Sequence, residues 1–224
     1  AIKSGEADLI VAGGVESMSR APLVMGKPEA AYGRSQKLED TTMGWRFINP
    51  KLKELYGVDS MPQTAENLAE QFNISREDQD KFAFNSQQRT ATAQAKGFFN
   101  KEIVAVEIPQ RKGEPIVIDT DEHPRASTTL EGLNKLKPVV KADGSITAGN
   151  ASGINDGAAA ILIASDDAIA TYNLKPRAKI IAATVVGVEP RIMGFGPAPA
   201  IKKLLAQTGL TLEQMDVIEL NEAF

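Results

Sequence analysis

The segments that most constrain this fold are apolar runs, long enough for a strand, that lack the alternation of a half-exposed strand. They lie at residues 7–12, 158–164 and 178–188. Nearly continuous apolar runs of this length predict strands buried on both faces, as in a sheet covered by helices. Gly13 and Gly14 are expected to end the first strand. The sequence therefore predicts an α/β fold.

The strongest helix signal lies between the first two apolar runs. Ser75 is placed to cap a helix that runs to about Lys96, and Glu77 and Asp78 suit its first turn because acidic groups stabilise the positive end of the helix dipole. Gly97 follows as a residue that can end the helix. A long helix is expected over residues 76–96.

Shorter signals predict the remaining elements. In chain order these are a helix end over residues 1–5, a helix that Thr64 caps and that runs through Glu70, a hairpin of strands 103–108 and 116–118, helices 167–172 and 197–207, a capping box of Thr211 and Gln214, and a strand 216–220. The last strand and the run at 178–188 would form a right-handed parallel crossover. Ligands of such sheets bind at the carboxyl ends of strands, where Asn221 lies.

Two irregular stretches, residues 22–73 and 119–141, interrupt this pattern. The first is too long for a plain loop in a compact domain, so it is expected to carry short elements and to cover a substrate or to contact another subunit.

Composition excludes several classes of protein. Hydrophobic residues make up 42% of the chain and charged residues 24%, which is typical of a globular domain. The net charge of −4 gives no basic surface for nucleic acid. No apolar run has the roughly 18 residues of a membrane span. The chain has no cysteine, and therefore no disulfide, thiolate metal site or thiol nucleophile; this is compatible with a cytoplasmic location, and no metal site is expected.

Four segments resemble thiolases of the degradative type. They are AGGVESMSRAP at 12–22, TAEN at 64–67, TAGNASGINDG at 147–157 and NEAF at 221–224. Their order and spacing also fit that family, along the whole chain. The stretch TTMGWRFINP at 41–50 further resembles the β-ketoadipyl-CoA thiolases of aromatic-compound breakdown.

The resemblance implies a layered αβαβα fold with mixed sheets, incomplete here, and an inserted loop (cap) domain. Residues 1–23 would be the end part of the N-terminal half, 24–154 the loop domain, 155–177 the last strand and helix of that half, and 178–224 the start of the C-terminal half. It also implies a homodimer or homotetramer, with tetramer contacts in the irregular stretch after Pro22.

The departure from the family is the absence of its nucleophile. Thiolases carry the reactive cysteine upstream of this segment, and a Gly-His-Pro motif and a second cysteine downstream of Asn-Glu-Ala-Phe. His123 precedes a proline but follows Glu122, and we interpret it as an exposed loop residue. The chain is therefore expected to be a central fragment that has no thiolase turnover by itself and only marginal stability.

The resemblance assigns roles to several residues. Asn221 would hold a water that forms an oxyanion hole, whereas without the resemblance it would be read as a strand end and helix cap. Glu222 is interpreted as supporting structure. Ala148 and Ser152 would contact the pantetheine arm of CoA, and Arg125 the adenine and phosphate region. Met61, Met193 and Phe224 would line the acyl or pantetheine tunnel, positions that are more often plain core.

A dicarboxylic substrate needs a cation or several donors for its second carboxylate when that group is buried. Arg46 lies in the stretch that carries the subfamily resemblance. We therefore interpret Arg46 as a candidate contact for that carboxylate.

The sequence thus favours an acetyl-CoA acyltransferase that cleaves a 3-ketoacyl-CoA, 3-oxoadipyl-CoA in particular, to acetyl-CoA and a shortened acyl-CoA. CoA and acyl-CoA would be its substrates, and no permanently bound cofactor is expected. The alternatives are a general fatty-acid or acetoacetyl-CoA thiolase and, from another class, a non-catalytic acyl-CoA-binding module on a thiolase scaffold.

Overall fold

The computed structural model describes all 224 residues, and these form two compact parts. Residues Ala1–Ser60 and Ile154–Glu219 make up one, called here the β1–β6 part. Residues Met61–Gly153 and Leu220–Phe224 make up the other, the α2–α3 part. Each is described by itself.

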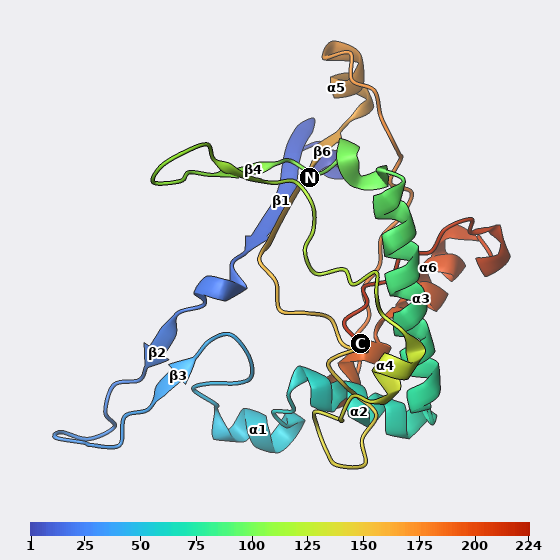
Figure 1. Cartoon of the computed structure of the whole chain (residues 1–224). Coiled ribbons are helices and arrows are strands. Elements are labelled where there is room, and N and C mark those ends of the chain that lie inside the picture. The colour runs from blue at the N-terminus through green and yellow to red at the C-terminus, as the bar shows by residue number, and fades with distance from the viewer. The chain divides into compact units, whose positions relative to one another are not determined.

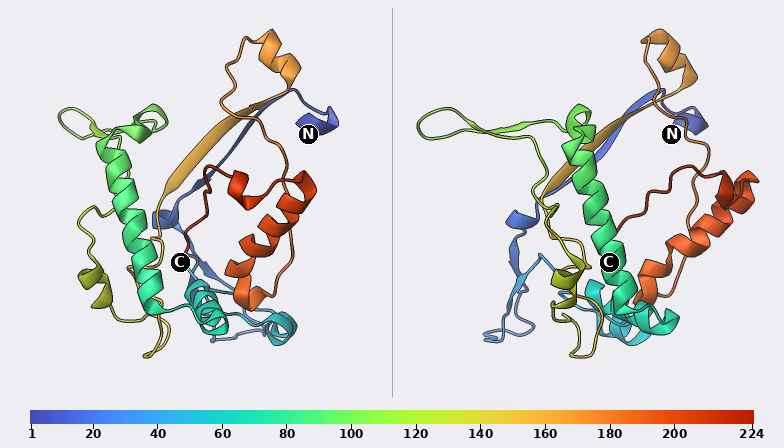
Figure 2. Two further views of the ribbon diagram at one scale, coloured as in Figure 1. Left: turned by 90° about the vertical axis from the view of Figure 1, so that its right-hand side faces the viewer. Right: turned by 45° about the vertical axis from the view of Figure 1, so that its right-hand side comes forward.

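The β1–β6 part is organised around two long strands, β1 (Leu9–Glu16) and β6 (Gly157–Ala164). They pair antiparallel over their whole length, from Leu9 opposite Ala164 to Glu16 opposite Gly157, and lie side by side in Figures 1 and 2. The expected strand end at Gly13 and Gly14 is wrong. A Cβ at Gly13 would lie 2.4 Å from the carbonyl oxygen of Ala159, so glycine lets the two backbones approach closely instead of ending the strand.

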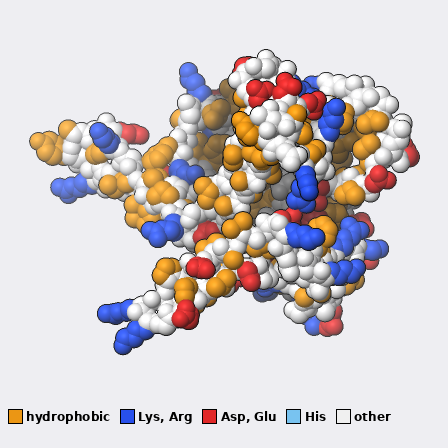
Figure 3. Space-filling view, turned by 90° about the horizontal axis from the view of Figure 1, so that it is seen from above, with side chains coloured by type: hydrophobic (Ala, Val, Ile, Leu, Met, Phe, Trp, Pro, Cys, Tyr) orange, Lys and Arg blue, Asp and Glu red, His pale blue; other side chains and the backbone are white.

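The expected burial of these strands on both faces is also wrong in this chain. Val11 is 74% exposed, Val15 79% and Ile161 62%. The space-filling view shows hydrophobic side chains spread over the face that it presents (Figure 3). The chain pairs these strands through their backbones but leaves much of their apolar surface uncovered.

The strands expected at 178–188 and 216–220 are not formed, and the parallel crossover that they implied is not formed either. The three sheets are two-stranded pairs, and all are antiparallel. A strand exists only where a neighbour supplies its hydrogen-bond partners, and neither segment finds one among these 224 residues.

Short elements fill the rest of the β1–β6 part. They are a 3₁₀ helix Ile2–Ser4, β2 (Leu23–Met25), β3 (Leu38–Asp40), α1 (Pro50–Tyr56), α5 (Asp166–Thr171), α6 (Pro197–Thr208), and 3₁₀ helices Met18–Arg20, Pro190–Phe195 and Leu212–Gln214. Gly5 ends the first at a φ of 75°, and the capping box of Thr211 and Gln214 is present. The short elements expected in the first irregular stretch and the two late helices are thus confirmed.

A polar contact links the two long strands at one end of the pair, where β1 ends and β6 begins. The backbone N–H and the Oγ of Ser19, after β1, donate to the carboxylate of Asp156, before β6, at 2.8 and 2.5 Å. These donors, the Ser19 hydroxyl first, lower the pKa of Asp156 from its ordinary value because they stabilise the charged carboxylate.

The α2–α3 part contains α2 (Met61–Phe72), α3 (Arg76–Ala95), a 3₁₀ helix Phe98–Lys101, β4 (Val106–Ile108), β5 (Ile116–Ile118) and α4 (Leu130–Asn134). The prediction for α3 is confirmed, because the Ser75 side chain accepts from the Asp78 N–H and Gly97 follows at a φ of 66°. The hairpin of β4 and β5 is confirmed as well.

The Thr64 cap is wrong. Thr64 lies inside α2, is 6% exposed, and its hydroxyl donates to the Met61 carbonyl one turn earlier. A threonine can satisfy its hydroxyl within a helix in this way, so its presence does not fix a helix start.

No helix of the structure has the length and apolar character needed to cross a membrane.

Candidate functional site

A buried carboxylate holds the start of the small-residue segment 145–152. Glu66, on α2, is 2% exposed and accepts hydrogen bonds from the backbone N–H groups of Ser145 and Ile146 and from the Ser145 hydroxyl, at 2.8 to 3.1 Å. A charge in such a position is stable only with several donors, and the chain itself supplies them.

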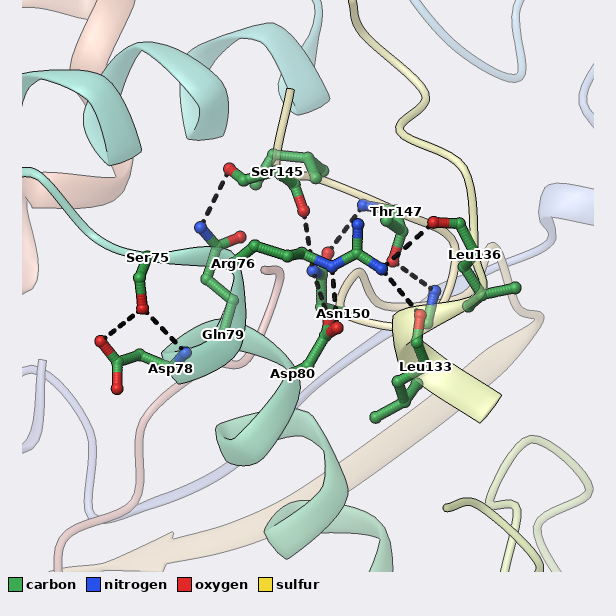
Figure 4. A network of polar contacts seen from close by, with 12 residues as sticks. Ser75, Arg76, Asp78, Gln79, Asp80, Leu133, Leu136, Ser145, Thr147 and Asn150 are labelled. Carbon is green, nitrogen blue, oxygen red and sulfur yellow. Dashed lines mark hydrogen bonds and ion pairs between the residues drawn. The ribbon is translucent and has the colours of Figure 1, made fainter. Parts of the chain in front are cut away.

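A second buried carboxylate holds the middle of the same segment (Figure 4). Asp80, on α3, is 1% exposed, and it pairs with Arg76 Nε at 2.8 Å and accepts from Asn150 Nδ2 at 3.0 Å. Asn150 Oδ1 in turn accepts from the N–H of Thr147 at 2.8 Å. Arg76 also donates to the carbonyl of Leu133 at 2.7 Å, which ties α4 to α3.

Close packing adds to these polar bonds. A Cβ at Gly149 would lie 2.5 Å from side-chain carbons of Leu133 and Leu136, so only a residue without a side chain fits there unless both leucines move. Ala148 and Ser152, on either side, stay exposed. The network therefore fixes the backbone of this segment and leaves these two residues open to a ligand.

The last residues of the chain return to the same segment. The backbone N–H of Ser152 donates to the carbonyl of Ala223 at 2.9 Å. The Oγ of Ser86, on α3, donates to Glu222 Oε2 at 2.5 Å. Asn221 is exposed, and its amide makes no hydrogen bond within the chain.

These contacts border a partly open cavity of about 180 Å³ within the α2–α3 part. This is smaller than the roughly 300–1,000 Å³ of a pocket for a whole drug-sized ligand, so it suits one segment of a longer molecule. Its lining comes from one face of α3, from the loop before α4, from the 149–152 backbone and from the end of the chain: Phe82, Ala83, Ser86, Gln87, Thr90, His123, Pro124, Gly149, Asn150, Ala151, Ser152, Glu222 and Phe224.

Two of the residues expected to bind CoA or the acyl chain, Ser152 and Phe224, line this cavity. Ala148 and Asn221 are chain neighbours of lining residues, and the N–H of Arg125 donates to the lining side chain Gln87 at 2.7 Å. The structure thus brings five of the expected site residues to one region of the α2–α3 part. Met61 begins α2, is 46% exposed, and is not part of the lining.

Arg46 and Met193 belong to the β1–β6 part. Arg46 Nη1 donates to the Gly44 carbonyl at 2.8 Å, and its charge adds a small share to the lowered pKa of Asp40, which hydrogen bonds from Thr42 mainly cause. Met193, in the 3₁₀ helix Pro190–Phe195, is 45% exposed.

Sequence reasoning missed the contribution of α3. Phe82, Ser86 and Thr90 follow one another at four-residue spacing and therefore share a face of the helix, a signal that could have predicted a ligand-facing stripe. His123 is exposed, as expected, yet it also lines the cavity.

Family comparison decides what kind of protein carries this cavity. A model of the thiolase N-terminal domain matches residues 1–167, and a model of the thiolase C-terminal domain matches residues 174–224. The chain belongs to the thiolase family.

Relatives of this thiolase chain include a β-ketoadipyl-CoA thiolase of Acinetobacter baylyi, 81% identical over 224 residues, and an acetyl-CoA acetyltransferase of Allochromatium vinosum, 47% identical over 224 residues. Both matches cover 100% of this chain and 56% of the relative, so the chain spans little more than half the length of these curated proteins.

Among solved structures, human mitochondrial 3-ketoacyl-CoA thiolase in complex with CoA matches with a TM-score of 0.86 and 44% identity, over 100% of this chain and 54% of that one. The expected thiolase fold is therefore confirmed, although two of its expected strands are unpaired in these 224 residues.

Proposed function

We propose that a full-length thiolase containing this sequence cleaves 3-oxoadipyl-CoA with CoA and releases acetyl-CoA and succinyl-CoA. The observation that carries the proposal is the cavity at which Ser152 and the Asn221–Phe224 segment meet. The 81% identity to a β-ketoadipyl-CoA thiolase supports the choice of substrate.

Asn221 is the residue of this chain closest to the chemistry in the proposal. Thiolysis needs a thiolate that attacks the ketone, a group that moves protons, and donors for the oxyanion that develops. The exposed amide of Asn221 can hold a water that donates to that oxyanion. The thiolate must come from outside these 224 residues, because they contain no cysteine, and the chain alone is expected to have no turnover.

CoA is the ligand proposed for the cavity. Ala148 and Ser152 would contact its pantetheine arm, Arg125 its adenine and phosphate region, and Phe224, Met61 and Met193 the tunnel for the arm or the acyl chain. The small volume of the cavity agrees with a site for part of the arm, with the rest of CoA outside it. No permanently bound cofactor is part of the proposal.

The domain assignment also remains a proposal. It takes residues 24–154 as the loop domain, 1–23 and 155–177 as parts of the N-terminal half, and 178–224 as the start of the C-terminal half. The proposed enzyme is a cytoplasmic homodimer or homotetramer. Segments beyond the matched 56% of the relatives would cover the apolar faces of β1 and β6.

A general thiolase for acetoacetyl-CoA or longer fatty 3-ketoacyl-CoA is the second candidate. The 47% identity to an acetyl-CoA acetyltransferase, against 81% to the β-ketoadipyl-CoA thiolase, makes it the weaker one. The test uses a full-length thiolase that contains this sequence, called the completed enzyme below. Its kcat/KM should be highest for 3-oxoadipyl-CoA among 3-oxoadipyl-CoA, acetoacetyl-CoA and 3-oxohexanoyl-CoA. A higher value for acetoacetyl-CoA would favour the general thiolase, and no thiolysis of any of the three would favour a binding module.

Arg46 tests the proposed contact with the substrate carboxylate. Arg46→Ala in the completed enzyme should raise KM for 3-oxoadipyl-CoA about tenfold or more and leave KM for acetoacetyl-CoA nearly unchanged. A hydrogen bond to a charged group contributes roughly 1.5–3 kcal/mol, and a loss of about 1.4 kcal/mol weakens binding tenfold. Equal increases for both substrates would reject Arg46 as that contact.

A further inference from the structure

The end of the chain is held by two bonds from two separate places of the α2–α3 part. Ser86 on α3 donates to the Glu222 carboxylate, and the N–H of Ser152 donates to the Ala223 carbonyl. These partners lie 136 and 71 residues away in the sequence. Together they fix the backbone directly after Asn221 to the helix on one side and to the 145–152 segment on the other.

Asn221 itself has no such restraint. Its amide is exposed and makes no hydrogen bond within the chain, so its direction depends on how the neighbouring backbone is held. Of the two bonds, the one from Ser86 is the only one made by side chains, and it lies on the residue adjacent to Asn221. It is therefore the contact through which a side-chain substitution can change the direction of the amide.

The Ser86–Glu222 contact is expected to contribute little to the stability of the fold. Glu222 is exposed, Ser86 is half-buried, and both line the cavity; a polar contact that is open to solvent on one side stabilises a folded protein only weakly. Geometry is a different matter, because a displacement of about 1 Å at a reacting group can lower a rate by about 100-fold. A contact with little effect on stability can thus have a large effect on catalysis.

We propose that Ser86 and Glu222 are a pair of positioning residues that aim the Asn221 amide at the oxyanion site. The proposal rests on the proposed function of Asn221 as the oxyanion-hole residue. Ser86 supplies the hydrogen and the Glu222 carboxylate accepts it, so a glutamine at position 222 keeps the acceptor oxygen and a threonine at position 86 keeps the donor.

The first experiment measures kcat and KM of the completed enzyme with 3-oxoadipyl-CoA. Ser86→Ala should lower kcat by roughly 10- to 100-fold and change KM for CoA by less than about threefold, with the thermal midpoint nearly unchanged. Ser86→Thr and Glu222→Gln should keep most of the activity. Thr92→Ala serves as the control, because Thr92 lies on the same helix, donates to the Gln88 carbonyl and is not part of the cavity lining.

The second experiment asks whether the pair acts through Asn221. In an Asn221→Ala background, which should itself lower kcat by about 100- to 1,000-fold, Ser86→Ala should have no further effect. A full additional loss in that background would overturn the proposal, as would wild-type kcat for Ser86→Ala alone. If Asn221→Ala left kcat unchanged, the proposed function of Asn221 would fail instead, so the two failures are distinguishable.

Discussion

The α2–α3 part and the β1–β6 part differ in how fully their polar groups are hydrogen-bonded and their apolar side chains are buried. In the α2–α3 part, Glu66, Asp80 and Asn150 are nearly fully buried, and each finds its hydrogen-bond partners within the chain. In the β1–β6 part, the strand ladder pairs the backbone of β1 and β6, yet side chains such as Val11 and Val15 remain largely exposed.

The difference indicates where the chain determines its own geometry. Directional polar bonds from α2, α3 and the end of the chain fix the backbone of residues 145–152, where the candidate ligand site lies, and all of these partners belong to the α2–α3 part. The β1–β6 pair has directional bonds only within its plane, and its faces need further packing to gain the hydrophobic stabilisation of a core. We therefore expect the most destabilising substitutions in the α2–α3 part to be those that remove a buried polar partner. In the β1–β6 part they should be those that prevent the close approach of the two strand backbones.

The largest expected effect follows from removing a buried charge. Asp80→Ala should destabilise the α2–α3 part by about 3 kcal/mol, the lower end of the range for breaking a buried pair, because Arg76 keeps 25% of its side chain exposed. Hydrogen exchange of the α3 amides in the completed enzyme measures this local stability.

The matched control is another pair with the same four-residue spacing. Lys135 and Glu131 are 73% and 80% exposed, so Glu131→Ala should cost no more than about 0.5 kcal/mol. Equal costs for the two substitutions would show that burial does not distinguish these parts.

Neighbouring glycines in β1 give the next largest effect. Gly13→Ala would place a Cβ 2.4 Å from the backbone oxygen of Ala159 and should destabilise the β1–β6 pair by about 2 kcal/mol, since overpacking forces the strands apart. At Gly14 nothing lies within 4 Å, and Gly14→Ala should stabilise the strand by about 0.5 kcal/mol. The comparison uses the exchange rates of the β1 and β6 amides; destabilisation by Gly14→Ala of the same size would contradict the close approach at Gly13.

The smallest effect concerns Asp156. The Ser19 donors lower its pKa in the folded state, so their stabilisation is present above the ordinary carboxyl pKa, about 3.9, and is lost as the pH falls through the lowered value. Protection of the Ser19 amide, corrected for intrinsic exchange, should therefore hold at pH 5 and weaken below pH 4. Asp156→Asn should remove this pH dependence, whereas Asp216→Asn should leave it intact.

How far sequence could predict this molecule depended on whether a signal was local. The start and the end of α3 were predicted correctly from Ser75, Glu77 and Gly97, because helix capping depends on residues within one turn. The prediction of strands at 178–188 and 216–220 was wrong, because a strand pairs with a neighbouring strand that is distant in the sequence, and these residues have no such neighbour here. Thr64 misled because its hydroxyl is equally satisfied inside a helix.

The site shows the same division. Ser152 and Phe224 could be chosen from motifs, and both line the cavity. The roles of Ser86 and Gln87 could not, because they follow from contacts across 136 and 38 residues that no local pattern records. The burial of Asp80 could not be predicted either. An acidic residue near the start of a helix is usually exposed, and only the contact with Asn150, 70 residues away, accounts for its burial.

Hydrogen exchange of the completed enzyme with and without saturating CoA tests the central claim most directly, namely that CoA binds at the cavity of the α2–α3 part. We predict slower exchange on CoA binding at residues 147–152 and 222–224, with the amides of β1 and β6 unchanged. Slower exchange confined to the β1–β6 part, or no change at residues 147–152, would contradict the account.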